Sequence, residues 1–196
     1  MSPFQSDGSV RKDGELMRRI AAGDTGALRQ IMDVQAPRLT RLALGIVGRL
    51  DEAEDVAQET LLALWNAAPQ WQEKSTVGAF LRTVATRKSI DLLRKRQSQV
   101  EDFEFDRLLD PGQGPEAELE KREDLARLAE MMAALPENQR TALVLAHFEG
   151  LSHAEAAETM ELGVDAYSSL LARARRALRQ KFEGAEMEKG GDDDHG

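Results

Sequence analysis

The sequence contains no cysteine, and aromatic residues make up only 5% of its 196 residues. The absence of cysteine excludes disulfide bonds, thiol catalysis and cysteine-bound zinc clusters, and it fits a reducing compartment. No apolar run is long enough to span a membrane, and the N-terminus does not resemble a secretory signal. We therefore expect a cytoplasmic protein that does not enter a membrane by itself.

Patterns typical of enzymes are also missing. The three histidines are His147, His153 and His195, and none has the spacing to acidic residues that motifs such as HExxH require. There is no glycine-rich loop that could cradle a phosphate. Glu149 and His153 are four residues apart, but they flank the turn at Gly150. We expect no catalytic residue, no metal site and no cofactor.

What the sequence does contain favours helix. Alanine, leucine, glutamate and arginine are common, and all of them have high helix propensity. The formal net charge of −9 argues against a free-standing nucleic-acid binder of the usual basic kind. The charge is unevenly distributed, however, with basic helices on either side of an acidic stretch. We predict an all-α fold of two small helical domains joined by a flexible acidic linker.

Residues 150–182 predict a helix-turn-helix. Ser152 and Glu155 have the spacing of a capping box for a first short helix, and Gly163 can stand at the N-cap of a second. The second helix has a predicted inward face of Val164, Tyr167, Leu171, Ala174, Leu178 and Phe182. Its opposite face has Asp165, Ser168, Ser169, Ala172, Arg173, Arg176 and Arg179. Such a helix can lie in a DNA major groove. The alternative is an ordinary surface hairpin with solvated arginines.

The N-terminal part begins with a predicted disordered arm, residues 1–12, followed by two helices up to about Gly48 with a kink or break at Pro37. The next predicted helix, residues 51–68, has an apolar arc opposite an acidic stripe that contains Leu62. A large aliphatic residue among acids suggests a protein partner with a basic, partly apolar surface. Packing of Leu62 on a neighbouring helix is the alternative. The apolar arc consists of Ala53, Val56, Ala57, Thr60, Leu61, Leu64 and Ala67.

The loop 66–78 and the helix 79–96 have groups suited to single-stranded nucleic acid. Trp71 offers a stacking face, Lys74 a phosphate contact, and Ser75 and Thr76 hydrogen-bonding groups. The alternative for Trp71 is a place in the core. We expect Leu81, Val84, Ala85 and Leu92 of the helix to face inward. Its basic side suits phosphate and consists of Thr83, Arg87 and Arg94 with Arg82, Lys88, Lys95 and Arg96.

The remaining segments are a predicted linker, the first helices of the second domain and a C-terminal tail. Residues 97–120 are acidic and rich in proline and glycine, which predicts a flexible linker. In the second domain we expect a helix that ends near Ala134 and another from Glu137 to about His147, with Leu143, Val144 and Phe148 inward. Residues 183–196 are predicted to be a disordered acidic tail.

Three stretches in this order resemble a known family. Residues 52–59 are similar to its acidic DAEDVxQE signature, residues 91–96 to the end of its promoter-melting helix, and residues 135–140 with 148–152 and 172–175 to its C-terminal helix-turn-helix domain. The chain thus resembles, from about Asp13 to Phe182, the extracytoplasmic-function group of bacterial sigma-70 factors. These are the two-domain sigma factors of RNA polymerase.

The resemblance implies a domain plan. Sigma domain two would occupy residues 13–97, the acidic linker 98–119 and sigma domain four 120–182, between the arm 1–12 and the tail 183–196. The partners implied are core RNA polymerase, through the clamp helices of its largest subunit and the flap of its second subunit, promoter DNA, and an anti-sigma factor.

The resemblance also implies three sets of site residues. The set that binds core polymerase would be Asp51, Asp55, Gln58, Glu59 and Leu62. The minus-ten set would be Trp71, Lys74, Ser75, Thr76, Thr83, Arg87, Lys88, Arg94 and Arg96. The minus-thirty-five set would be Ser152, Asp165, Ser168, Ser169, Ala172, Arg173, Arg176 and Arg179.

The sequence departs from the family's common pattern at the helix-turn-helix. Many members have glycine where Glu161 stands, lysine where Ser168 stands and arginine where Leu170 stands. We therefore do not expect the family's usual promoter sequence to apply. The alternative function is a stand-alone helix-turn-helix regulator in which residues 13–97 bind a ligand or dimerise, but it gives the acidic stripe no role.

Overall fold

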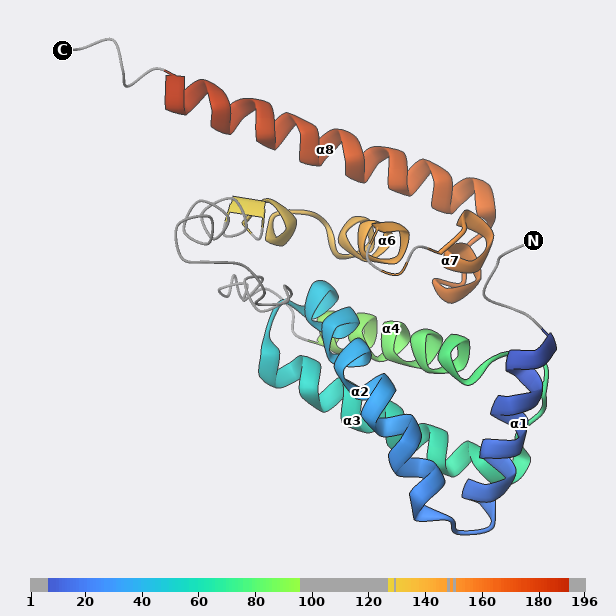
Figure 1. Cartoon of the computed structure of the whole chain (residues 1–196). Helices are drawn as coiled ribbons and strands as arrows, with labels where there is room; N and C mark the ends of the chain where they lie inside the picture. Colours follow the sequence, from blue (N-terminus) through green and yellow to red (C-terminus); the bar gives the residue numbers. More distant parts are fainter. Residues whose placement is uncertain (1–6, 96–126, 129, 148, 150, 191–196) are drawn as a thin grey trace. The chain divides into compact units, whose positions relative to one another are not determined.

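The computed structural model describes residues 7–95, 127–128, 130–147, 149 and 151–190, and all regular elements among them are helices (Figure 1). The predicted all-α fold is therefore confirmed for this part of the chain. The chain divides into two compact units, Met1–Val100 and Glu101–Gly196. The predicted linker, residues 98–119, lies outside the described residues, as do residues 120–126 of the predicted second domain.

In the part of the first unit that the structure describes there are four α-helices and one short 3-10 helix. They are α1 (Asp7–Ala21), α2 (Thr25–Val47), α3 (Leu50–Ala67), η1 (Ala68–Gln70) and α4 (Val77–Lys95). Helix α2 packs against both α3 and α4, and α1 lies beside η1 and the segment that leads into α4. The core between these helices is aliphatic and includes the fully buried Leu39, Leu64 and Leu81.

The ends of α2 follow from local chemistry. The Asp24 carboxylate caps its start by accepting a hydrogen bond from Ala27 N at 3.0 Å. Gly48, at φ 86°, ends it in the left-handed conformation that favours glycine. Of the kink or break predicted at Pro37, the break is wrong, because α2 is continuous from Thr25 to Val47. Proline removes one backbone hydrogen bond, and burial of Leu39 and of the residues from Leu42 to Val47 offsets that loss.

The second unit contains the predicted helix-turn-helix. Residues 127–128 and 130–133 are helical, and α6 (Glu137–His147), α7 (His153–Thr159) and α8 (Val164–Gly190) follow. Helix α8 packs against both α6 and α7 (Figure 1). Tyr167, Leu171 and Ala174 form its buried face, and the Tyr167 hydroxyl donates to the Ala142 carbonyl oxygen at 3.0 Å.

Both predicted disordered ends are partly helical. Helix α1 begins at Asp7, inside the predicted arm 1–12, and α8 continues to Gly190, inside the predicted tail 183–196. Composition predicted disorder there because these segments contain few apolar residues. Propagating an existing helix adds a hydrogen bond for each residue that it orders, without a new nucleation step. Residues 1–6 and 191–196 lie outside the described residues.

Some expected core residues are exposed. Val164 and Phe182 are 48% and 40% exposed, so the buried face of α8 is shorter than the periodicity predicts. In α4, Leu81 and Ala85 are buried as expected, but Val84 and Leu92 are only half-buried. Ser89, Ile90 and Leu93 are buried there instead. The Ser89 hydroxyl donates to the Ala85 carbonyl oxygen at 2.8 Å, so this polar side chain is satisfied within the helix and can be buried, which the apolar pattern alone does not reveal. Phe148 lies outside the described residues.

Candidate nucleic-acid and protein interfaces

The outward face of α3 is acidic with an apolar centre. Asp51, Asp55, Gln58 and Glu59 are all exposed, while the predicted apolar arc from Ala53 to Leu64 is buried. Leu62 is 57% exposed, so it does not pack into the first unit as the alternative interpretation requires. Trp65, three residues on, is 36% exposed. The result is an apolar spot within an acidic face, which suits a basic partner helix.

Two acidic residues of this face are paired within the chain. Arg49 Nη2 lies 2.8 Å from Asp51 Oδ2, and its hydrogen bonds hold the pKa of the Asp51 carboxyl below its ordinary value. Lys88 Nζ of α4 lies 2.5 Å from Glu59 Oε2. Glu59 belongs to the set expected to bind polymerase and Lys88 to the minus-ten set. This ion pair therefore joins two surfaces to which we assigned different partners.

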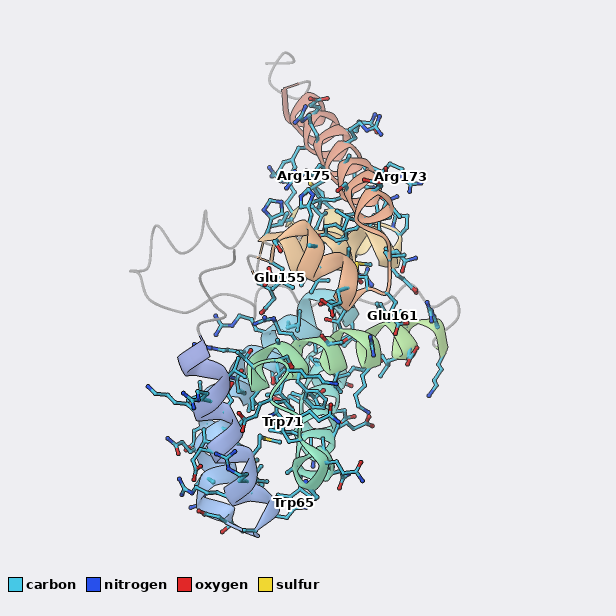
Figure 2. All side chains as sticks on the ribbon, turned by 90° about the vertical axis from the view of Figure 1, so that its right-hand side faces the viewer. Trp65, Trp71, Glu155, Glu161, Arg173 and Arg175 are labelled. Carbon is cyan, nitrogen blue, oxygen red and sulfur yellow. The ribbon has the colours of Figure 1, made fainter. Side chains whose placement is uncertain are left out.

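The loop between η1 and α4 has the predicted stacking residue. Trp71 is half-buried, and its ring meets Phe80 of α4 edge to face, with centroids 5.4 Å apart. Figure 2 shows Trp71 next to α4. The indole Nε1 atom is buried and has no hydrogen-bond partner among the described residues. Trp71 thus packs against the first unit but is not sealed inside it.

The polar groups of this loop have distinct roles. Lys74 is exposed, and Ser75 is half-buried. Thr76 caps α4, because its hydroxyl oxygen accepts from Ala79 N at 3.1 Å. Its hydroxyl is therefore already engaged within the chain.

Helix α4 presents the remaining residues of the minus-ten set. Arg87 and Arg94 are exposed, and Arg94 lies 3.6 Å from Asp91. The Thr83 hydroxyl donates to the Ala79 carbonyl at 3.1 Å. Arg96 lies outside the described residues. The structure brings the described members onto one helix beside the Trp71 loop.

The helix-turn-helix begins with the predicted capping box. The Ser152 hydroxyl oxygen accepts from Glu155 N, and the Glu155 carboxylate accepts from Ser152 N at 2.9 Å. Because this hydroxyl also donates to Glu155 Oε2 at 2.6 Å, Ser152 is engaged in capping, although it is exposed. Glu161 adopts φ 57° in the turn between α7 and α8.

Helix α8 presents most of the predicted minus-thirty-five set to solvent. Asp165, Ser169, Ala172, Arg173, Arg176 and Arg179 are exposed, whereas Ser168 is half-buried. Ser168 Oγ lies 3.0 Å from His153 Nδ1 of α7, which links the two helices of the motif. Figure 2 shows Arg173 and Arg175 on opposite sides of α8. Arg175 points toward α6, where its Nη2 lies 3.5 Å from His147 Nε2.

The described residues offer neither a metal site nor a membrane span. They contain no group of three or more histidine, aspartate or glutamate side chains placed to hold a metal ion. None of their helices is both long and apolar enough to cross a membrane.

Sequence reasoning missed the residues that fix the Trp71 loop. Arg18 Nη1 of α1 lies 2.6 Å from Glu73 Oε1, and Val77 N donates to Asp13 Oδ2 at 2.8 Å. The partners are 55 and 64 residues apart in the chain. Helical periodicity reports only neighbours within one element, so no signal in the sequence pointed to these contacts.

Comparisons with known proteins agree with this arrangement. Residues 33–99 match the family model of sigma-70 region 2, and residues 125–178 match that of sigma-70 region 4. The chain is 33% identical over 156 residues to the ECF RNA polymerase sigma factor EcfG of Rhodopseudomonas palustris, covering 79% of this chain and 84% of EcfG. It is 30% identical over 177 residues to the RNA polymerase sigma-H factor of Pseudomonas aeruginosa, covering 85% and 92% of the two chains.

Two solved structures are similar in fold. CnrH, solved in complex with the cytosolic domain of CnrY, has a TM-score of 0.65 and 25% identity, over 88% of this chain and 97% of CnrH. The sigma factor RpoE of Bartonella quintana, solved with the anti-sigma factor NepR, has a TM-score of 0.63 and 24% identity. That alignment covers 79% of this chain and 96% of RpoE.

Proposed function

Since the chain belongs to the ECF group of sigma-70 factors, which direct transcription initiation by RNA polymerase as non-catalytic subunits, we propose how its surfaces divide this task. The acidic face of α3 docks on the clamp helices of the largest polymerase subunit. The Trp71 loop and α4 recognise and open the minus-ten element. Helix α8 recognises the minus-thirty-five element, and the second unit contacts the flap of the second polymerase subunit.

The exposure of Leu62 carries the docking proposal. An aliphatic side chain that is 57% exposed leaves apolar surface in contact with water. Binding of a partner that covers this surface is therefore favourable. Asp55, Gln58 and Glu59 surround it with groups that attract basic residues. A basic helix with an apolar centre would satisfy both features. Within the polymerase, the clamp helices are the expected partner of this kind.

The minus-ten proposal is supported by the half-buried Trp71. Its ring packs against Phe80 in a T-shaped contact, so the ring needs little further ordering before a base stacks on it. A stacked base contributes about 1–3 kcal/mol to binding. The exposed Arg87 and Arg94 on α4 supply positive charge for the phosphates of the same strand. We assign the base-capture role to this loop and helix together.

We also propose an anti-sigma partner that covers one or both units. The support is the likeness to CnrH, which was solved in complex with a protein domain that is itself cytosolic. An exposed apolar spot on α3 offers such a partner the same surface that docks on polymerase. Competition between core polymerase and the partner would then control activity.

Run-off transcription tests the promoter assignments. Purified core polymerase with the full chain should start RNA synthesis at defined positions on a pool of genomic promoter fragments, and core alone should not. If Trp71→Ala and Arg173→Ala both initiate at the wild-type rate on the recovered promoters, the assignment of these surfaces is wrong.

Charge reversal tests the docking surface. Asp55→Lys and Leu62→Asp should each abolish co-elution with core polymerase in size-exclusion chromatography. Asp33→Lys is the matched control, because Asp33 is also an exposed aspartate on a helix of the first unit, α2. Co-elution of both α3 variants at the level of Asp33→Lys would exclude this face as the docking site.

A further inference from the structure

We propose that α1 positions the promoter-opening loop, and that Asp13, Gly14 and Arg18 hold Trp71 in the geometry that captures a base. This inference rests on the proposed minus-ten role of the loop. Helix α1 lies outside residues 33–99, which match the region 2 model. The contacts that α1 makes with the loop and with the start of α4 indicate its role.

The first contact is an ion pair between α1 and the loop. Arg18 Nη1 lies 2.6 Å from Glu73 Oε1, and Arg18 Nη2 lies 2.6 Å from Glu15 Oε2 on its own helix. The two carboxylates raise the pKa of the Arg18 guanidinium further above its ordinary value. Glu15 orients the guanidinium, so that its second donor pair faces the loop. Glu73 is two residues from Trp71.

The second contact fixes the end of the loop. Asp13 Oδ2 accepts a hydrogen bond from Val77 N, the first residue of α4, at 2.8 Å. A carboxylate is favourable at this position, because the N-terminus of a helix has a partial positive charge. Asp13 thereby ties the start of α4 to α1. Since Phe80 lies on the same first turn of α4, this contact also fixes the ring on which Trp71 packs.

The third observation is the fit at Gly14. A Cβ atom at this buried position would lie 2.3 Å from Glu73 Oε1 and 2.5 Å from Glu73 Cδ. Glycine within a helix is unfavourable relative to alanine, so its presence in α1 needs a packing reason. The close passage of Glu73 over α1 supplies that reason. Gly14 and Arg18 are one helical turn apart and therefore act on the same loop side chain.

Together these contacts restrict the loop from both sides. Glu73 is held by α1, the start of α4 is held by Asp13, and Trp71 is held by Phe80. A loop that is already ordered loses less conformational entropy when it binds a base. Breaking the contacts of α1 should therefore slow promoter opening, and this effect requires no contact between α1 and the DNA.

Tryptophan fluorescence tests the effect on the loop in the free, full-length chain. The only two tryptophans are Trp65 and Trp71, so Trp65→Phe leaves Trp71 as the single reporter. In this background, Arg18→Ala and Gly14→Ala should increase quenching of Trp71 by acrylamide. Arg19→Ala is the matched control, because Arg19 is the next residue of α1 and pairs with Asp24 at 2.7 Å, away from the loop. Equal quenching in all three variants would overturn the proposal.

Promoter opening tests the consequence in the holoenzyme, on a promoter recovered by run-off transcription. Arg18→Ala and Gly14→Ala should open it about two- to five-fold more slowly than wild type, the range expected from losing one exposed ion pair. Arg19→Ala should open it at the wild-type rate. The charge swap Arg18→Glu with Glu73→Arg should recover much of the lost rate, which a purely structural defect would not.

Further measurements on the same variants distinguish the proposed role of α1 from the proposed role of the Trp71 loop. Gly14→Ala should leave the melting temperature within about 3 °C of wild type, because a better helix former offsets the displaced Glu73. All α1 variants should bind core polymerase as wild type does. If Trp71→Ala opens the promoter at full rate, the proposed role of the loop fails. If Trp71→Ala is slow but Arg18→Ala and Gly14→Ala are not, only the role of α1 is overturned.

Discussion

At the scale of single residues, Glu161 occupies a position that favours glycine. Its N–H donates to the Glu158 carbonyl at 3.1 Å, and Leu162 N donates to the Ala157 carbonyl at 2.8 Å. These two bonds form a Schellman motif at the end of α7, with Glu161 at the position that must be left-handed. At φ 57° a side chain with a Cβ atom is strained, by roughly 1–2 kcal/mol.

Glycine at this position should stabilise the second unit. We expect Glu161→Gly to be about 1 kcal/mol more stable to urea than Glu161→Ala, because both lose the same side chain but only glycine relieves the strain. Urea titration of the full-length variants, followed by circular dichroism, measures the difference. Equal stability of the two variants would mean that the turn is not strained in solution.

Tyr167 joins a buried ring to a buried hydrogen bond. Its hydroxyl donates to the Ala142 carbonyl of α6 at 3.0 Å, and the residue is fully buried. Tyr167→Phe removes this bond and should lower the free energy of unfolding by about 1 kcal/mol. Guanidinium denaturation of both proteins at neutral pH measures the loss. An unchanged midpoint would show that the hydrogen bond contributes nothing.

The same residue predicts a dependence on alkaline pH. Burial raises the pKa of the Tyr167 phenol above its ordinary value of 10.0. The unfolded chain therefore loses this proton at a lower pH than the folded chain does. The contribution of the protonated Tyr167 phenol to the free energy of unfolding is full below about pH 10 and decreases as the pH rises through the folded pKa. Wild type should lose more stability than Tyr167→Phe in this range. Because Tyr167 is the only tyrosine, its ionisation can be followed directly by ultraviolet absorbance.

At the scale of elements, α8 separates two kinds of arginine. Arg173 and Arg175 are both exposed, but they project to opposite sides of the helix, and Arg175 points toward His147 of α6 (Figure 2). If the side of α8 that faces away from α6 enters the DNA, then of these two arginines only Arg173 can contact it. The two residues thus form a matched pair for locating the DNA-binding side.

Exchange of each arginine for alanine in the holoenzyme tests this assignment. Arg173→Ala should weaken promoter binding by about 1–3 kcal/mol if it contacts a base. If it contacts a phosphate instead, the slope of the logarithm of the binding constant against the logarithm of the salt concentration should decrease in magnitude by about one. Arg175→Ala should do neither. A larger effect from Arg175→Ala would place the DNA on the side of α8 that faces α6.

Periodic features of the elements were predictable from the sequence, and contacts between elements were not. The buried arc of α3 and the Ser152 capping box depend on residues within one or two turns, so their spacing predicted them. Continuation of α2 through Pro37 depends on packing around it, and the ion pairs Lys88–Glu59 and Arg18–Glu73 depend on how helices meet. Such tertiary contacts override local propensity and leave no local pattern.

Exposure of a single residue could also not be settled from the sequence. The position of Leu62 on its helix was clear, but the same pattern allowed either a neighbouring helix or solvent beside it. The structure decides for solvent at Leu62. For Val164 and Phe182 the prediction is wrong, because both were expected inside and are exposed. A helical period gives the direction of a side chain and not what lies in that direction.

At the scale of the whole molecule, charge limits what the free protein can do. The net charge is −9, yet the candidate DNA-binding surfaces on α4 and α8 are basic. Each surface offers only a few positive side chains, and nonspecific affinity for DNA grows with the number of phosphates neutralised. The acidic remainder of the chain opposes approach to a duplex. Each unit alone should therefore bind DNA weakly at physiological salt.

Core polymerase should raise the affinity for a promoter, because it holds both units at once and lets their two weak DNA contacts act together. Once both units are docked, binding of one promoter element makes binding of the other intramolecular, and affinity can rise by about 10²–10⁴ without any new contact. We expect no detectable promoter complex with the free chain in gel-shift assays at physiological salt and a stable complex when core polymerase is added. Asp55→Lys should remove the complex in the presence of core, because it prevents docking, whereas Asp33→Lys should not. Tight, sequence-specific binding by the free chain would contradict this account, since it would mean that the units need no larger assembly to bring their contacts together.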